Sequence, residues 1–373
     1  MDMQKNVREV MKAFALRTGL VGKEHVPKRY LWTDAFAVCN FLGLYQENRD
    51  EKYKELASKL VDQVHQVLGK FSKEDSRSGW ISGLSDKEAL KHPTIGGLRI
   101  GKALCEREEN EPYDDKKEWD RDGQYFHYLT KWMHALSRMT QVTGDAKYNQ
   151  WAIELAVTAH KNFTYYDKSS MQQKMYWKMS IDLKRPLVLS MGQHDALDAW
   201  VTYQELQKIA HNERLVFEIK EAKAMAEKMQ MRSDDPLGIG GLLNAAFFLM
   251  QISQEKEIVF LEQMLRSAFE GLDLYLRGDS RLNYSPDYRL AFRELGLAIG
   301  LTSVPKMRSF MPDSTTIKAL ETYCPLGQKL LDFWAKPENQ DNSTFKDHID
   351  INSVMLATAL HPEGYLHIGG ETY

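Results

Sequence analysis

The sequence predicts an all-α protein built as a closed ring of six helical hairpins. Three observations lead to this prediction. Two kinds of helical segment alternate along the chain, short and long connections alternate between them, and no stretch shows the apolar-polar alternation of a strand. A helix with one apolar stripe needs burial on one side, whereas a helix that is apolar all round must be buried on every side. A ring with inner and outer helices meets both needs.

The first kind of segment carries a single apolar stripe. In residues 51–68, Tyr53, Leu60 and Val64 fall on one face at steps of three and four. Such stripes predict the outer helices. They occur at 3–17, 51–68, 146–163, 214–230, 256–276 and 315–335. We expect Pro325 to break or kink the last of these helices, because proline lacks the backbone N–H that a helix interior uses.

The second kind of segment is apolar almost all round, as in "LGIGGLLNAAFFLMQI" at 237–252. These segments predict the inner helices. They occur at 34–46, 124–142, 194–210, 237–252, 288–301 and 349–360. Short turns such as "TGDAK" (143–147) follow the inner helices, and longer segments follow the outer ones. We therefore expect one domain over 1–373, in which the short turns lie on one face of the ring and the long connections lie on the opposite face.

The longest connection, 71–122, is rich in charge and is expected to lie over the ring mouth. It is interpreted either as a lid that closes on substrate or as a surface excursion that covers helix ends. An α-solenoid or an irregular helical bundle is the alternative architecture. A solenoid would show a stricter repeat period than these segments have.

Composition narrows the function classes. The chain has 373 residues, a net charge of −3 and 27% charged residues without a basic stripe, so neither nucleic acid nor an anionic membrane is expected as a partner. Cys39, Cys105 and Cys324 lie far apart, which argues against disulfides and against a cysteine zinc site. We expect a cytoplasmic protein with no membrane span, no metal and no cofactor, and the sequence does not show whether a leader has been removed.

Polar and aromatic residues recur where the inner helices begin. "RYLWTDAFAVCNFLGLYQ" (29–46) opens the first inner helix, and "WDRDGQYFHYL" (119–129) and "MGQHDALDAW" (191–200) open the second and third. All these starts belong to the face with the long connections, so their side chains are expected to converge on one cavity. The residues are Trp32, Asp34, Trp119, Asp122, Tyr125, His127, His194, Asp195, Arg289, Glu294, His348 and Asp350, with Trp80 and Arg99 from the 71–122 segment.

In architecture the chain resembles the six-hairpin glycosidase-like superfamily, whose members are (α/α)6 toroids. The resemblance covers essentially the whole chain, but no short motif singles out one family. It implies a glycoside hydrolase acting on a short oligosaccharide or modified sugar, and it favours inversion of the anomeric centre. Hydrolysis needs one protonated and one ionised carboxyl group, and Asp34, Asp122 and Asp195 are the catalytic candidates.

The remaining candidates are assigned to substrate binding, because tryptophan faces suit sugar rings and arginine can fork onto a carboxylate or a hydroxyl pair. Each residue also has a structural interpretation. Asp34 and Asp122 fit helix caps, and His194 with Asp195 fits a structural pair.

Two other functions stay open. A sugar isomerase or epimerase resembling the N-acylglucosamine 2-epimerase group would use His127, His194 and His348 as acid and base. The late histidine-rich motif of that group is not evident around 340–360, which ranks this alternative second. The third possibility is a non-catalytic sugar-binding toroid. The sequence does not fix the oligomeric state.

Overall fold

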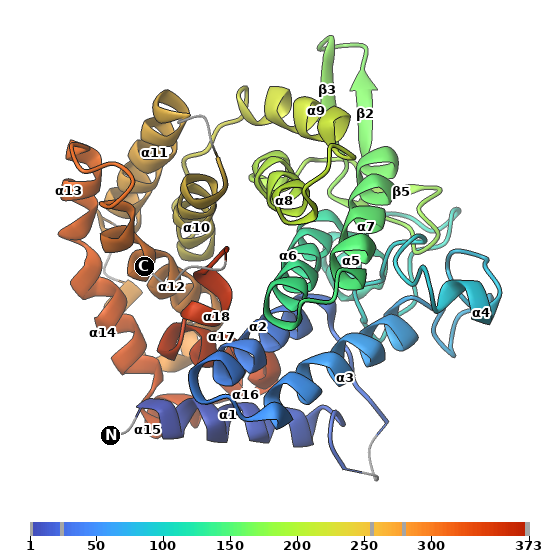
Figure 1. Cartoon of the computed structure of the whole chain (residues 1–373), viewed down its shortest axis with the longest axis horizontal. Coiled ribbons are helices and arrows are strands. Elements are labelled where there is room, and N and C mark those ends of the chain that lie inside the picture. The colour runs from blue at the N-terminus through green and yellow to red at the C-terminus, as the bar shows by residue number, and fades with distance from the viewer. Residues whose placement is uncertain (1–2, 23–25, 254–256, 278–280, 370–373) are drawn as a thin grey trace. The chain divides into compact units, whose positions relative to one another are not determined.

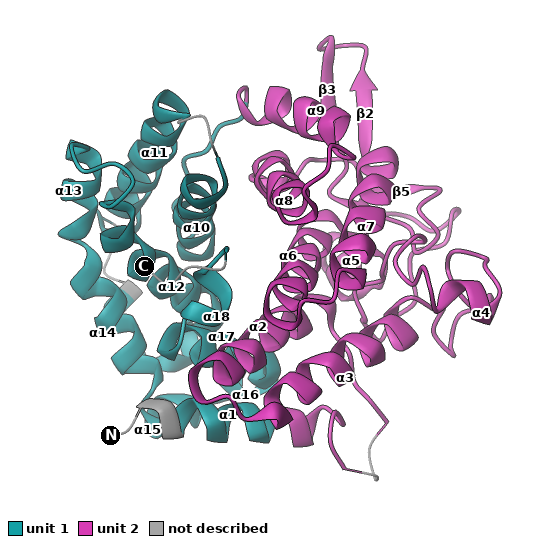
Figure 2. Ribbon diagram, viewed as in Figure 1, with its two compact units in different colours: residues 1–14, 229–373 teal, residues 15–228 magenta. Residues whose placement is uncertain are grey.

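The chain forms two compact units in a computed structural model, which describes residues 3–22, 26–253, 257–277 and 281–369 (Figures 1 and 2). Unit 1 consists of residues 1–14 and 229–373, and unit 2 of residues 15–228. The first helix, α1 (Met3–Arg17), crosses the boundary between them.

Unit 2 is built on three helical hairpins, each with a buried helix followed by a helix with a wet side. The pairs are α2 (Leu31–Asn48) with α3 (Glu51–Leu68), α6 (Phe126–Thr143) with α7 (Lys147–Phe163), and α8 (Asp195–Ala210) with α9 (Val216–Ala226). The middle buried helix, α6, packs against both α2 and α8. The residues of α2 are buried without interruption from Leu31 to Leu44, which fits an inner helix.

Unit 1 has its own three buried helices, α10 (Pro236–Ile252), α12 (Ala291–Met307) and α17 (Ile349–Leu360). Helix α12 packs against both others. Gly240 allows its close approach to α10, because a Cβ there would lie 2.1 Å from the carbonyl oxygen of Gly296. The other elements of this unit are α11 (Ile258–Arg277), η1 (Arg281–Asn283), η2 (Pro286–Tyr288), α13 (Thr315–Glu321), α14 (Cys324–Trp334), α15 (Pro337–Gln340), α16 (Ser343–Asp347) and α18 (Glu363–Leu366).

Two helix predictions in unit 1 can be compared directly with the structure. The break expected at Pro325 is confirmed, since α13 ends at Glu321 and Pro325 lies in the first turn of α14. The end predicted for the 288–301 helix was wrong, because α12 continues through Pro305 to Met307. Pro305 cannot bond to the carbonyl of Leu301, four residues earlier, and that carbonyl accepts instead from the Cys324 thiol.

The short strands of unit 2 were not predicted. They are β1 (Gln124–Tyr125), β2 (Thr164–Asp167), β3 (Gln172–Met175), β4 (Lys178–Met179) and β5 (Pro186–Val188). Strands β1, β4 and β5 form one antiparallel sheet, while β2 and β3 form a hairpin that projects beyond α7 (Figure 1). Strands of two to four residues are too short to show an alternating pattern in the sequence.

The 71–122 segment belongs to unit 2 and contains two short helices, α4 (Asp86–Ala89) and α5 (Asp115–Asp120). Its middle part is not a solvated excursion, because Leu98 and Ile100 are fully buried. The Ile100 carbonyl accepts from the backbone N–H of Leu31, and the Ile100 N–H donates to the Gly123 carbonyl. The segment thus joins the starts of α2 and α6. Its place over a ring mouth stays a prediction.

Candidate functional site

The three buried helices of unit 2 begin close together. The hydroxyls of Tyr30, just before α2, and Tyr128, in α6, lie 2.8 Å apart. The Nδ1 atom of His127, in α6, lies 3.9 Å from a carboxyl oxygen of Asp195, the first residue of α8. The convergence of helix starts predicted from the sequence is therefore present within this unit.

Aromatic side chains lie around these helix starts. The ring of Tyr125 lies 5.2 Å from those of Trp177 and Tyr128, 5.4 Å from His127 and 6.3 Å from Trp119, between centroids. The rings of Trp119 and Trp177 meet nearly at right angles, and the Trp177 ring is close to parallel with His127. Trp119 is 50% exposed, whereas Tyr125 is buried. We call Trp119, Tyr125 and Trp177 the aromatic wall.

Strand pairing explains why Trp177 belongs to this wall. Tyr125 pairs with Lys178 in the β1–β4 ladder, and the backbone N–H of Phe126 donates to the Trp177 carbonyl. The ladder therefore brings a residue of the long 164–193 connection to the start of α6. The wall depends on a sheet that the sequence does not reveal.

Asp195 is buried, and none of the described residues gives it a charged partner in hydrogen-bond contact. One carboxyl oxygen accepts from the backbone N–H of Gly192 at 3.1 Å, and the other lies 3.9 Å from His127, too far for a hydrogen bond. A Cβ at position 192 would lie 2.4 Å from that carboxyl, so Gly192 is required for this approach. Burial, aided by the charge of Asp198, raises the pKa of Asp195 to about 8. Asp195 is thus mainly protonated at neutral pH.

His127 has the opposite shift. Its Nδ1 atom is buried and has no hydrogen-bond partner among the described residues, although the side chain as a whole is partly exposed. Burial lowers the pKa of His127 to about 4, with the Asp198 charge opposing this shift and the Lys131 charge adding to it. At neutral pH the imidazole and the Asp195 carboxyl therefore face each other uncharged.

Asp198 follows Asp195 by one helical turn and has an ion-pair partner. Its carboxylate lies 3.2 Å from the Nζ atom of Lys131, and both side chains are partly exposed. Two aspartates on the first turn of α8 thus differ in environment, since one is buried beside a neutral imidazole and the other faces an ammonium group.

Asp34 is a buried member of an ion pair. It accepts from Nη1 of Arg29 at 3.2 Å and from the backbone N–H of Tyr30 at 2.9 Å. Arg29 is held in turn by the carbonyl of Thr18 at 2.6 Å. The carboxylate reaches back over the first turn of α2, so its contacts are those of a cap reinforced by a buried arginine.

Asp122 has a similar set of contacts. It accepts from Nη1 of Arg99 at 2.7 Å and from the backbone N–H groups of Gly101 and Gly123, each at 3.0 Å. The remaining Arg99 donors go to the carbonyls of Val67 and Lys70. The Arg99–Asp122 pair therefore fastens the 97–101 backbone to the start of α6.

The other candidates in unit 2 have contacts of their own. Trp32 is buried and packs on Phe36, with ring centroids 4.4 Å apart. Trp80 is also buried, and its indole N–H donates to Asp86 at 2.7 Å. His194 is the residue before α8, next to Asp195.

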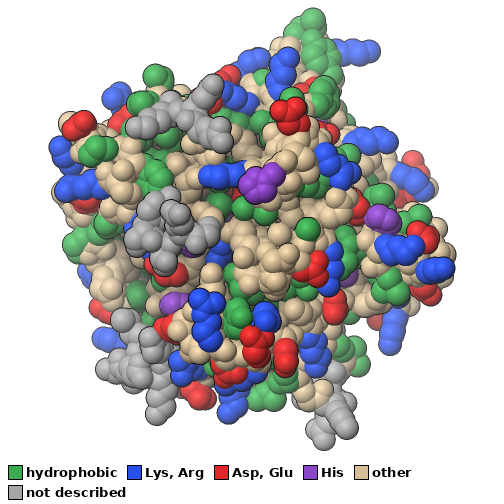
Figure 3. Space-filling view, in the orientation of Figure 1, with side chains coloured by type: hydrophobic (Ala, Val, Ile, Leu, Met, Phe, Trp, Pro, Cys, Tyr) green, Lys and Arg blue, Asp and Glu red, His purple; other side chains and the backbone are tan. Residues whose placement is uncertain are grey.

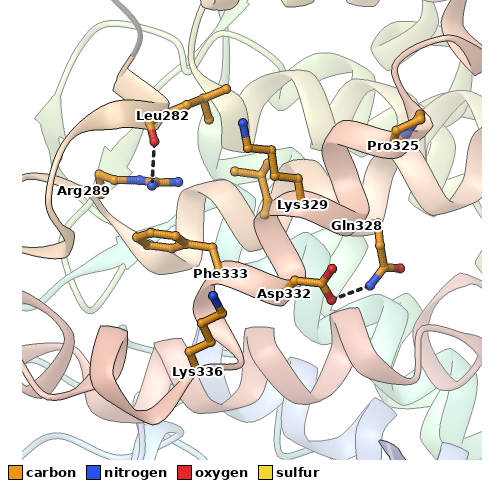
Figure 4. Close-up of a pocket in the computed structure, with 9 residues that line it drawn as sticks. Leu282, Arg289, Pro325, Gln328, Lys329, Asp332, Phe333 and Lys336 are labelled. Carbon is orange, nitrogen blue, oxygen red and sulfur yellow. Dashed lines mark hydrogen bonds between the residues drawn. The ribbon is translucent and has the colours of Figure 1, made fainter.

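In unit 1, Arg289 and Glu294 bind each other. Arg289 donates twice to the Glu294 carboxylate, at 2.9 and 2.6 Å, and the indole N–H of Trp334 donates to it at 2.7 Å. The Arg289 guanidinium lies over the Phe333 ring and also donates to the Leu282 carbonyl (Figure 4). The arginine that pairs with Glu294 is thus Arg289, from the same segment of the chain.

A pocket of about 450 Å³ lies beside Arg289 (Figure 4). Its walls include Lys329, Asp332 and Phe333 of α14, and the first two are exposed. Because the Arg289 guanidinium is already bound to Glu294, this pocket offers no acid–base pair. His348 is exposed and its ring packs against Phe292, while Asp350 lies in the first turn of α17.

Sequence reasoning did not point to Lys131. It noted Asp198 only among the polar residues that open the third inner helix, and Trp177 only as a further aromatic face for a sugar ring. Asp198 could have been recognised from the sequence, because it follows Asp195 by three residues and residues three apart on a helix share a face. Lys131 follows His127 by four residues, which also places both on one face. Trp177 has no such signal, since it reaches the site only through the β1–β4 pairing.

Over the described residues, no group of three or more His, Cys, Asp and Glu side chains is arranged to hold a metal ion. No helix in that part of the chain is long and apolar enough to cross a membrane. On the face shown in Figure 3, acidic and basic side chains are interspersed.

Comparison with known proteins gives matches in structure only. No protein-family model matches the sequence, and neither does any curated protein. The GH76A α-1,6-mannanase from Salegentibacter sp. HEL1_6 has a TM-score of 0.58 at 12% identity, over 96% of this chain and 99% of that chain. Cellobiose 2-epimerase from Spirochaeta thermophila DSM 6192 has a TM-score of 0.53 at 10% identity, over 96% and 98%. D-mannose isomerase has a TM-score of 0.54 at 11% identity, over 96% of each chain.

These likenesses show the fold. The chain has the all-α (α/α)6 fold of these proteins, as the alternation of helical segments predicted. The likeness extends over nearly the whole chain in each case, so it covers both units.

Proposed function

We propose that the protein is a glycoside hydrolase in which Asp195 is the general acid and Asp198 the second carboxylate. One observation carries this proposal: two aspartates one turn apart on α8 have contrasting environments, one buried beside a neutral imidazole and the other partly exposed and paired with a lysine. Burial keeps Asp195 protonated to about pH 8, and Asp198 faces the Lys131 ammonium. Two carboxyl groups in such contrasting environments are what acid–base hydrolysis of a glycosidic bond requires.

In this mechanism Asp195 donates its proton to the leaving oxygen as the glycosidic bond breaks. In the retaining course Asp198 attacks the sugar carbon, and water then hydrolyses the glycosyl ester and returns a proton to Asp195. In the inverting course Asp198 takes a proton from the water that attacks the sugar carbon directly. Residues one turn apart on a helix have Cβ atoms roughly 5–6 Å apart. Retention requires carboxyl groups about 5–5.5 Å apart, and inversion requires a wider separation that leaves room for water. The superfamily resemblance favours inversion, and the first anomer released distinguishes the two outcomes.

The surroundings of Asp195 and Asp198 suit a sugar ligand. Trp119 exposes half of its surface, and aromatic faces pack well against the C–H faces of sugar rings. The fold neighbours are an α-1,6-mannanase, an epimerase and an isomerase, and an inactive form of the mannanase was solved with α-1,6-mannotriose. In this proposal Asp34 and Asp122 position the starts of α2 and α6.

The test follows α-1,6-mannotriose and cellobiose by proton NMR with the wild-type protein and the variants Asp195→Asn, Asp198→Asn and Asp34→Asn. Cleavage lost in the first two variants, and retained in folded Asp34→Asn, supports the assignment. Cleavage that persists in Asp195→Asn contradicts it. Binding of either sugar without any reaction would instead support the non-catalytic toroid.

A sugar isomerase or epimerase is the second candidate, and the free Nδ1 of His127 favours it. A neutral imidazole 3.9 Å from a protonated carboxyl is a base next to an acid, which suits proton transfer beside a carbonyl. Mannose and cellobiose incubated in D2O provide the test. Deuterium incorporation without cleavage, lost in His127→Ala, would favour this function over hydrolysis.

We also propose a reducing, cytoplasmic location. The three cysteines are free, with Cys39 buried and Cys105 exposed. Exposed thiols persist in reducing compartments. Recovery of the protein in the cytosolic fraction of its host, with Cys105 titrating as a free thiol, is the expected result.

A further inference from the structure

Lys102 stands at the Trp119 end of the aromatic wall. Its Nζ atom lies 5.7 Å from the centre of the Trp119 ring, and the side chain is half-buried. Within the described part of the chain, Lys102 forms neither a salt bridge nor a hydrogen bond through its ammonium group. Its backbone is held in place, because the preceding residue, Gly101, donates its N–H to Asp122.

A second lysine on the same wall differs from it in contacts. Lys178 is fully buried, and its Nζ atom lies 5.3 Å from the Tyr125 ring. Lys178 donates to the carboxylate of Glu118 at 2.9 Å and to the carbonyls of Glu118 and Arg121 at 2.7 and 2.9 Å. All three donors of Lys178 are therefore used by the protein, whereas those of Lys102 are not.

The acids around Lys102 are bound to other residues. Asp122 is paired with Arg99, and Glu118 is paired with both Arg107 and Lys178. Asp120 is exposed and forms no salt bridge with Lys102. Burial and the charge of Lys178 lower the pKa of Lys102, whereas the charges of the nearby acids Asp120, Asp122 and Glu118 act in the opposite direction. An ammonium group that is partly desolvated and unpaired gains most from an added anion.

We infer that Lys102 binds an anionic group of the substrate beside Trp119, so that this protein acts on acidic sugars. The inference rests on the proposed function. The ring face of Trp119 would pack against the sugar, and the ammonium group would pair with a carboxylate or a phosphate on it. A neutral sugar at the same place would leave the ammonium group without a partner. Uronates and sugar phosphates share the chemistry that this site recognises.

Binding is tested with ligands that differ only in charge: methyl α-glucoside, methyl α-glucuronide and methyl α-glucoside 6-phosphate. None needs to be turned over, and affinities are measured by calorimetry at two salt concentrations. The variants are Lys102→Met and Lys102→Arg. Lys52→Met is the matched control, because Lys52 also lies over an aromatic ring, Tyr53, but at an exposed outer helix.

We expect wild type to bind at least one anionic ligand about tenfold more tightly than the neutral one, less so at high salt. Lys102→Met should lose this preference, Lys102→Arg should keep part of it, and Lys52→Met should keep all of it. The carboxylate and phosphate arms show which anion is preferred. Equal affinity for neutral and anionic ligands, or a preference that survives in Lys102→Met, overturns the inference.

The experiments can refute the hydrolase proposal and the anion site at Lys102 independently of each other. Cleavage of neutral oligosaccharides together with equal binding of all three ligands would refute the role of Lys102 and leave the hydrolase. A charge preference that depends on Lys102, without any catalysis, would refute the hydrolase and leave the anion site.

Discussion

Both units bring the starts of three buried helices together, but the acids at these starts have different surroundings. In unit 1, Arg293 pairs with Asp235 at 2.7 Å, which links α12 to α10, and the backbone N–H of Phe292 donates to Asn352 of α17. Asp235 also caps α10 through Gly238, and Glu294 is bound by Arg289. In unit 2, Asp195 has one backbone donor and a neutral histidine beside it.

These contacts distinguish the acids that stabilise the fold from Asp195, whose burial lowers the stability of the fold. Asp34 and Asp122 in unit 2 and Glu294 in unit 1 each accept hydrogen bonds from an arginine, so these carboxylates fasten parts of the fold together. Asp195 has its ionised form destabilised, which is the usual condition of a catalytic acid.

The largest effect is expected for Asp195→Asn. Loss of a general acid should lower kcat by about 10²–10⁴-fold. The same change should stabilise the protein, because an amide removes the cost of burying an ionisable group. The pKa of Asp195 is raised, so its penalty is absent below pH 3.8 and grows until pH 8. The gain should therefore be on the order of 5 kcal/mol at pH 8 and near zero at pH 4.

Chemical denaturation at both pH values, beside steady-state kinetics, measures the two parts of this prediction. Asp34→Asn is the matched control in the same unit and should lower stability at pH 8. If Asp195→Asn also lowers stability at pH 8, Asp195 is a structural acid and the comparison between the units is lost.

The next effect is expected for Arg289→Met in unit 1. This change leaves the Glu294 carboxylate buried with the Trp334 indole as its remaining side-chain donor. Removing one partner of a buried ion pair costs about 3–5 kcal/mol. Urea unfolding should show the loss, and Arg289→Met with Glu294→Gln should recover part of it. A loss in the single variant that the second change does not reduce would show that packing on Phe333, and not the ion pair, is what Arg289 provides.

Much of the fold was predictable because helix periodicity is a local property. The segments predicted at 51–68 and 349–360 are helices with those bounds. The sheet around β4 was not predictable, because its pairing joins Tyr125 to Lys178 across more than fifty residues with no local signal.

The candidate site was predictable in part. Asp195 and His127 could be proposed from the sequence because helix starts converge in a ring. The arginines that bind Asp34 and Asp122 come from connecting segments, and sequence does not show that Arg29 and Arg99 turn back onto these acids. Separating a structural acid from a proton donor therefore required the contacts themselves.

A smaller effect is expected from pH, and it arises in unit 2. Burial opposes protonation of His134, but Glu205 at 2.8 Å and the Cys39 thiol outweigh it and raise its pKa to about 9. A raised histidine pKa gives stability that is complete below pH 6.5 and is lost as pH rises through 9. Wild type should lose on the order of 3 kcal/mol across this window. Unfolding curves from pH 6 to 10 measure the loss, which His134→Gln should reduce. An equal loss in that variant would assign the effect to other groups.

The smallest effect is expected for Arg293→Met, four residues from Arg289. The Arg293–Asp235 pair is about one-third exposed on both sides, so water screens it and can replace either partner. Such pairs contribute about 0.2–1 kcal/mol. Asp235→Asn should cost equally little, because asparagine can still cap α10. Both losses should shrink in high salt, whereas the loss in Arg289→Met should not. If Arg293→Met costs as much as Arg289→Met, burial does not separate these two pairs, and the same reasoning would fail for Asp34 and Asp122.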